Sequence, residues 1–97
     1  MNLLNYLINN KIERKTTMTK VIFRKFKENN EIIALFPNEI ANEYEECWSY
    51  MHIGQHSPAI YNAVVGCTKL ATEDEYAELL EELKYIGYDD LKVCKRK

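Results

Sequence analysis

Apolar positions near the start of the sequence gather in two short runs that have the character of β-strands. Residues 20–27 and residues 31–36 are rich in β-branched and aromatic side chains. Between them stands Glu28-Asn29-Asn30, and asparagine tolerates the positive φ that a tight turn requires. The pattern predicts a β-hairpin. We expect Pro37 to end its second strand, because proline cannot donate to a sheet ladder.

The middle of the chain carries two more strand patterns. Residues 47–53 alternate between two faces, which predicts a third strand, and residues 54–58 have the composition of a turn. Residues 61–68 contain β-branched side chains and predict a fourth strand, with Gly66 at a bulge. For residues 38–46 the pattern leaves a short helix and an acidic loop equally open.

The clearest element is a helix over residues 73–86. Thr72 and Glu75 form a capping-box sequence, and Gly87 suits the positive φ that often follows a helix. Within the helix at 73–86, apolar side chains recur every three or four positions, at Tyr76, Leu79, Leu80, Leu83 and Ile86. Beyond the helix, residues 91–93 alternate as a short closing strand.

These elements predict an α+β fold: a single small domain with a mixed, mainly antiparallel sheet of about five strands and one amphipathic helix packed on one face. The fourth strand, the helix and the last strand would form a right-handed crossover if those two strands run parallel. We place the domain at residues 18–97. Residues 1–17 are expected to be an N-terminal extension, flexible or a short helix, because asparagines interrupt its apolar stripe.

The composition narrows the class of protein. The chain has 97 residues, of which 46% are hydrophobic and 29% charged, an ordinary balance for one globular domain. No stretch approaches the run of about 18 apolar residues that a membrane span needs. The three cysteines form no CxxC pair, which favours reduced thiols. We therefore expect a cytoplasmic protein that does not bind a membrane.

Charge is unevenly distributed along the chain. Residues 1–27 carry a net charge of +6, residues 28–90 a net charge of −12 and residues 91–97 a net charge of +4. The two basic ends would form one basic patch if they meet in the fold; the alternative is that opposite charges simply pair within the molecule. Such a patch would draw on Lys20, Arg24, Lys25, Lys27, Lys92, Lys95, Arg96 and Lys97.

Side chains with functional chemistry are densest between positions 48 and 61. The two histidines there stand four positions apart, but they flank a predicted turn rather than sharing a helix face, so the spacing does not predict a metal site. The cysteines lack a histidine at a suitable place, and three glycines cannot form a phosphate-binding loop. We expect no catalytic residue, no metal and no cofactor. The candidate binding residues are Trp48, Tyr50, His52, Gln55, His56 and Tyr61.

A pattern of strands and a helix runs through residues 20–26 (KVIFRKF), 33–37 (IALFP), 49–56 (SYMHIGQH), 71–76 (ATEDEY) and 86–88 (IGY). This pattern resembles a group of small uncharacterised proteins that occurs in gut bacteria and in their phages and mobile elements. The resemblance implies a setting, that of a small cytoplasmic accessory protein acting on host machinery. It implies no catalytic residue, since no activity is attached to the group. The similarity would cover residues 18–97.

These observations predict a non-enzymatic protein that binds a macromolecular partner, with another protein favoured. The acidic residues at 39–46 and on the outer face of helix 73–86 could occupy a basic groove by imitating nucleic-acid phosphate. We expect the binding residues in a loop at 53–61, while Trp48 could serve equally in the core. The alternative is a nucleic-acid-binding sheet domain that uses its basic termini. Self-association also stays open.

Overall fold

The computed structural model describes residues 18–52 and 54–97. The predicted extension at 1–17 lies outside the described residues, as does position 53. The elements in chain order are β1 (Thr19–Phe26), β2 (Ile32–Ile40), β3 (Cys47–Met51), β4 (Gln55–Ala59), α2 (Tyr61–Gly66), β5 (Thr68–Leu70), α3 (Glu73–Tyr85) and β6 (Leu91–Val93).

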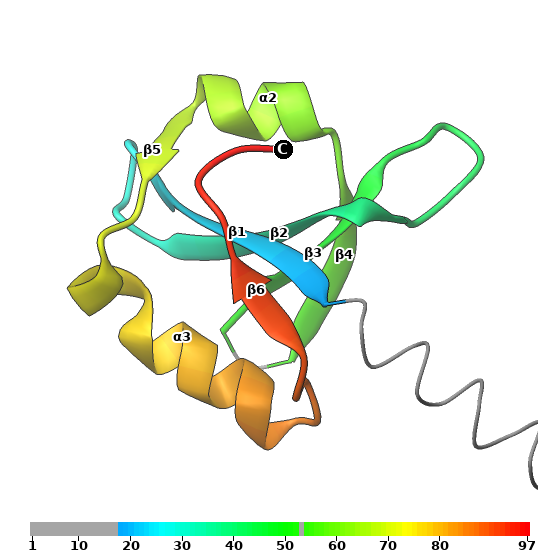
Figure 1. Cartoon of the computed structure of the whole chain (residues 1–97). Helices are drawn as coiled ribbons and strands as arrows, with labels where there is room; N and C mark the ends of the chain where they lie inside the picture. The colour runs from blue at the N-terminus through cyan, green and yellow to red at the C-terminus, as the bar shows by residue number, and fades with distance from the viewer. Residues whose placement is uncertain (1–17, 53) are drawn as a thin grey trace, which may run out of the picture.

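The strands form one mainly antiparallel sheet with a helix on each face. Their order is β4-β3-β2-β1-β5, and β6 pairs in parallel with the first part of β1. Figure 1 shows α2 on one face of the sheet and α3 on the other. The α+β class and the mainly antiparallel sheet are confirmed. Within the described residues, two strands, β4 and β5, and one helix, α2, were not predicted from the sequence pattern.

The face beneath α3 holds the larger core. Residues of β1 alternate between the faces, so Val21 and Phe23 point toward α3. The Phe23 ring stacks on Tyr76 of the helix at 4.3 Å between ring centroids. The leucine stripe of α3 packs into this cluster. The buried members of the cluster are Val21, Phe23, Ala34, Phe36, Tyr50, Leu79 and Leu83.

The opposite face is packed with smaller side chains and is covered by α2. Tyr61 and Val64 of α2 contact this cluster, and Cys94 reaches it from the C-terminal end. None of the α2 residues is buried, so this helix lies as a thin cover rather than as a second core element. The buried members of the cluster are Ile22, Ile33, Leu35 and Cys47.

Both strong local predictions are confirmed. The hairpin turn places Asn30 at φ 65°, and the Phe26 N–H donates to the Glu31 carbonyl at 2.8 Å. In the capping box, Thr72 Oγ1 accepts from the Glu75 N–H at 3.3 Å, while the Thr72 N–H donates to Glu75 Oε1 at 2.8 Å. Gly87 follows the helix at φ 125°.

The predicted end of the second strand is wrong. β2 continues through Pro37 to Ile40, and its register with β3 shifts between Phe36 and Ile40. A proline is tolerated at such an irregularity, because the missing N–H falls where the ladder is already broken. Residues 41–46 form a loop, so the acidic-loop alternative holds there rather than the helix.

The predictions for the next segment are also wrong. Residues 55–59 form β4 rather than a turn, and residues 61–66 form α2 rather than a strand. Gly66 is the last residue of that helix, and Cys67 after it is exposed instead of packed within a strand. The chain must pass from β4 at one edge of the sheet to β5 beside β1, and a helix across the face makes this connection (Figure 1).

The predicted crossover is not present. β5 runs antiparallel to β1, whereas β6 runs parallel to it, so β5 and β6 run in opposite directions. The helix between them therefore does not join two parallel strands. It carries the chain from one end of β1 to the other, which places the beginning of α3 near the hairpin turn and its end near Thr19.

Candidate functional site

A cleft of about 390 Å³ opens between the first half of α3, the start of β2 and the tip of the β3–β4 hairpin. Its walls combine apolar side chains with carboxylates, a histidine and an amide. Such a mixture of an apolar surface and a few polar groups is typical of binding sites. The lining residues are Glu31, Ile32, Met51, His52, Gln55, Glu75, Glu78 and Leu79.

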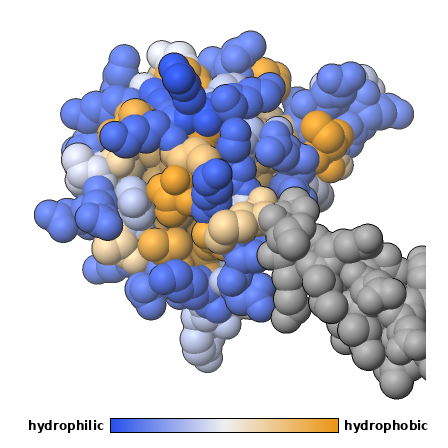
Figure 2. Space-filling model, in the orientation of Figure 1, coloured by the Kyte–Doolittle hydropathy of each residue, from blue (hydrophilic) through white to orange (hydrophobic). Residues whose placement is uncertain are grey.

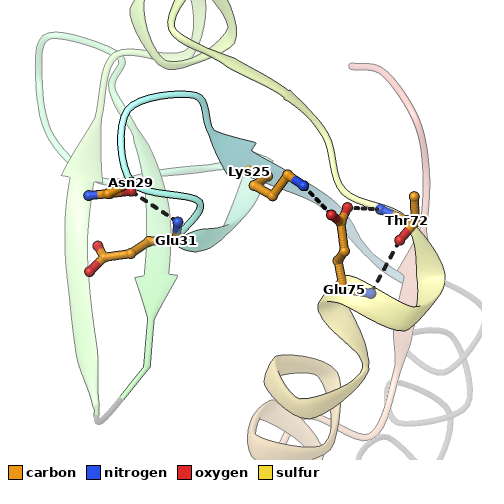
Figure 3. Close-up of polar contacts among 5 residues, drawn as sticks. All are labelled: Lys25, Asn29, Glu31, Thr72 and Glu75. Atoms are coloured by element: carbon orange, nitrogen blue, oxygen red, sulfur yellow. Dashed lines mark hydrogen bonds and ion pairs between the residues drawn. The ribbon is translucent and has the colours of Figure 1, made fainter.

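Two of the three carboxylates in the cleft are unengaged. In the ranges that the structure describes, the side chains of Glu31 and Glu78 make no hydrogen bond or ion pair, and both residues are exposed. The Glu31 backbone is fixed, since its N–H donates to Asn29 Oδ1 at 2.9 Å (Figure 3). These two acids can therefore accept hydrogen bonds from a ligand without breaking an internal contact.

The third carboxylate, that of Glu75, makes contacts that hold the beginning of α3 in place. The Glu75 side chain forms an ion pair with the Lys25 ammonium group, and it also accepts from the Thr72 N–H (Figure 3). The Lys25 contact, followed by the Thr72 backbone contact, lowers the pKa of Glu75 to about 2. This carboxylate stays ionised at neutral pH, and it ties the beginning of α3 to β1.

A second polar cluster fixes the hairpin tip against α3. The Tyr50 hydroxyl donates to the Glu82 carboxylate and accepts from the Gly54 N–H at 2.9 Å. His52 Nδ1 lies 2.5 Å from the other Glu82 oxygen. The hydrogen bond to Glu82, together with burial, raises the pKa of Tyr50, because both favour the protonated phenol. This cluster makes one wall of the cleft rigid.

His56 is held by the segment that follows α3. Its Nε2 lies 3.0 Å from the Tyr88 hydroxyl, and its ring meets Tyr50 edge-on at 4.6 Å between centroids. Tyr88 in turn stacks on Phe36 at 5.2 Å. Burial, and then the charges of nearby acids, raises the pKa of Tyr88. The side chain of His56 thus has partners that lie far from it in the sequence.

The six predicted binding residues do not form one site. His52 and Gln55 line the cleft, while Tyr50 and His56 lie beside it in the cluster with α3 and its following segment. Trp48 is farther along β3 and is 37% exposed, so it is not a fully buried core residue. Tyr61 lies on the opposite face, in α2. The expected binding loop at 53–61 is largely an edge strand.

The sequence pattern missed the carboxylates that matter here. Glu82 was expected on the solvated face of the helix, yet it is half-buried and accepts from Tyr50. Its position three residues after Leu79, on the flank of the apolar stripe, is the local signal that could have indicated this contact. Glu31 and Glu78 come together only because α3 packs across the sheet, and the sequence carries no signal for that.

The remaining chemistry of the described residues is limited. No three of their His, Cys, Asp and Glu side chains lie close enough together to hold a metal ion. Burial raises the pKa of the Cys47 thiol, which disfavours the reactive thiolate. What the cleft offers is negative charge above an apolar surface.

Comparisons with known proteins add no relative: no family model, curated protein or solved structure gives a significant match to the chain. Neither of the described helices has the length and apolarity that crossing a membrane requires.

Proposed function

We propose that this protein is a non-catalytic binding module for a protein partner that presents basic side chains. The observation that carries the proposal is the pair of unengaged carboxylates, Glu31 and Glu78, beside the apolar wall of the cleft. A carboxylate pair accepts hydrogen bonds from guanidinium or ammonium groups, and charged hydrogen bonds of this kind are the stronger ones.

The apolar wall suits the same ligand. Ile32, Met51 and Leu79 line the cleft next to the carboxylates. Lysine and arginine carry a charged head on an aliphatic stem, and the stem is stabilised by contact with apolar surface. A basic side chain can therefore contact both halves of the cleft at once, whereas a purely apolar side chain would contact only the apolar wall.

The surroundings of the cleft extend the negative charge. Glu73, Asp74 and Glu81 are exposed on α3, and only Glu81 has a basic partner, Lys84 at 3.6 Å. Clustered charge of one sign speeds the encounter with an oppositely charged partner and limits the choice of partner. This supports recognition of a basic protein surface rather than of one isolated side chain.

The proposed setting is that of an accessory protein of a phage or mobile element acting on host machinery. Many host proteins that bind nucleic acid do so through basic grooves, and a row of carboxylates can imitate phosphates in such a groove. Binding alone then suffices to block or redirect the host protein, without a catalytic step.

The test is an affinity capture from nuclease-treated bacterial lysate with three forms of the protein. One is the parent chain, one carries Glu31→Gln with Glu78→Gln, and the control carries Glu43→Gln with Glu45→Gln in the exposed loop after β2. Both variants lose two negative charges. We expect protein partners that the parent and the loop variant retain and the cleft variant loses. Equal retention by all three forms would place the binding surface elsewhere.

A further inference from the structure

The two basic ends of the chain meet in the sheet. In the parallel pair of β1 and β6, Lys20 stands directly opposite Lys92. Because Val21 faces α3 and Ile22 faces α2, the alternation of β1 puts Lys20 on the α2 side, and its partner Lys92 projects on the same side.

The C-terminal tail continues this positive charge over the same face. The Cys94 N–H donates to the Val21 carbonyl at 2.8 Å, which fixes the start of the tail against β1. At its end, Lys97 Nζ lies 5.1 Å from the centre of the Tyr61 ring, and Figure 1 shows the C-terminus beside α2. We call the resulting surface the basic strip; it consists of Lys20, Lys92, Arg96 and Lys97, whereas Lys95 lines a pocket together with Glu73 of α3.

No carboxylate neutralises the basic strip within the described residues. Their ion pairs involve Lys25, Lys84 and His52, none of which belongs to the strip. The helix that covers this side, α2, contains neither Asp nor Glu. Asp90, next to β6, accepts from the Thr19 hydroxyl at 2.9 Å. Its negative charge contributes to the raised pKa of Tyr88 on the α3 side.

The strip differs from the basic set expected from the sequence. Lys25 is engaged by Glu75 on the α3 side. Arg24 donates to Thr68, from Nε to the hydroxyl at 2.7 Å and from Nη2 to the carbonyl at 3.0 Å. Arg24 and Lys25 therefore make contacts within the molecule. The cations of the strip come mainly from β6 and the C-terminal tail instead.

We propose that the basic strip binds the phosphate backbone of single-stranded nucleic acid, independently of the acidic cleft. Four cations without an ion-pair partner match a ligand whose negative charges repeat, and each phosphate contact gains from the release of condensed counterions. A single strand is flexible enough to follow a short strip that ends where the Lys97 ammonium group lies over the Tyr61 ring.

Next to the strip, Lys95 of the tail and Glu73 of α3 line one pocket, so basic and acidic side chains lie close together there. Figure 2 shows apolar side chains exposed among hydrophilic ones on the face that carries β6.

The test is fluorescence anisotropy of the full chain with a labelled thymidine oligonucleotide of about 20 nucleotides and with a duplex of the same length. If about four phosphates are contacted, affinity for the single strand should fall about 50-fold between 50 and 200 mM salt. Weaker binding of the single strand than of the duplex, or affinity independent of salt, would overturn the proposal.

Matched variants locate the contact. Lys92→Gln with Arg96→Gln removes two charges from the strip, and Lys69→Gln with Lys84→Gln removes two exposed lysines outside it. We expect the strip variant to reduce the magnitude of the logarithmic salt slope by about 1.4 and the control to leave it unchanged. Equal effects of the two variants, or equally tight binding of a polyglutamate of similar length, would contradict recognition of nucleic acid by the strip.

Discussion

The face of the sheet beneath α3 is packed with aromatic rings and bordered by carboxylates, whereas the face beneath α2 is packed with aliphatic side chains and bordered by lysine and arginine. The two helices differ in the same way. α3 has 13 residues, a capping box and two buried leucines; α2 has six residues, no side-chain cap and no buried residue. The local sequence therefore favours the helix α3, whereas α2 depends on its packing against the sheet.

The difference between the faces predicts unequal costs of truncation. Leu83 is fully buried beneath α3, so Leu83→Ala should lower the free energy of unfolding by about 2–5 kcal/mol. Val64 in α2 is only half-buried, so Val64→Ala should cost about 1 kcal/mol or less. Urea unfolding of both variants checks this, and equal costs would contradict a thin α2 layer.

Two buried hydroxyl groups on neighbouring residues sharpen the comparison. Tyr50→Phe removes a hydrogen bond to the Glu82 carboxylate, which should cost about 1.5–3 kcal/mol. Ser49 faces the other way and donates to the Ser57 carbonyl at 2.8 Å, so Ser49→Ala should cost about 0.5–1.5 kcal/mol. The measurement is again urea unfolding. A Tyr50→Phe variant as stable as the parent would mean that Glu82 does not fix the hairpin to α3.

The helix caps give a smaller effect. Thr72→Ala removes the cap of α3 and should cost about 1 kcal/mol, with a lower melting temperature. Ile60 stands at the same position of α2 but makes no cap bond and is 57% exposed. Ile60→Ala should therefore change stability by less than about 0.5 kcal/mol. If the second change matched the first, the contrast between the helices would be wrong.

The smallest effect is a dependence on pH. The pKa of Glu75 is lowered from 4.5 to about 2, so the folded state binds this proton less readily than the unfolded chain. Its contribution is fully present above about pH 4.5 and is lost as the pH falls toward 2. The difference in urea midpoint between the parent and Glu75→Gln should shrink over that range. A difference that is constant with pH would show that the carboxylate charge is not what matters.

Local signals predicted the elements on the α3 side well. The alternation of β1, the asparagines of the hairpin turn and the Thr72–Glu75 capping box each act within a few residues, so they can be read from sequence. The α2 segment carries two conflicting signals. Its valines favour a strand, yet Tyr61, Val64 and Val65 also have the spacing of one helix face, and packing against the sheet decides between them.

Other features depend on contacts between distant residues. The sequence of β4, Gln55–Ala59, reads as a turn, and it becomes a strand because β3 supplies its partner. The cleft forms because α3 brings Glu78 toward Glu31 and the hairpin tip. The charge pattern left two outcomes open, a single basic patch or pairing of opposite charges within the molecule, and it could not show which lysines and arginines the fold would engage.

The most direct test of the account is an NMR titration of the isotope-labelled protein with a short arginine-containing peptide, followed by backbone amide shifts. If the cleft binds a basic side chain, the shifts should concentrate at Glu31, Gln55 and Glu78, and Glu31→Gln with Glu78→Gln should abolish them. The basic strip should not respond. Shifts spread evenly over all acidic residues, or no shift in the cleft at millimolar peptide, would contradict the central claim that this cleft is the binding site.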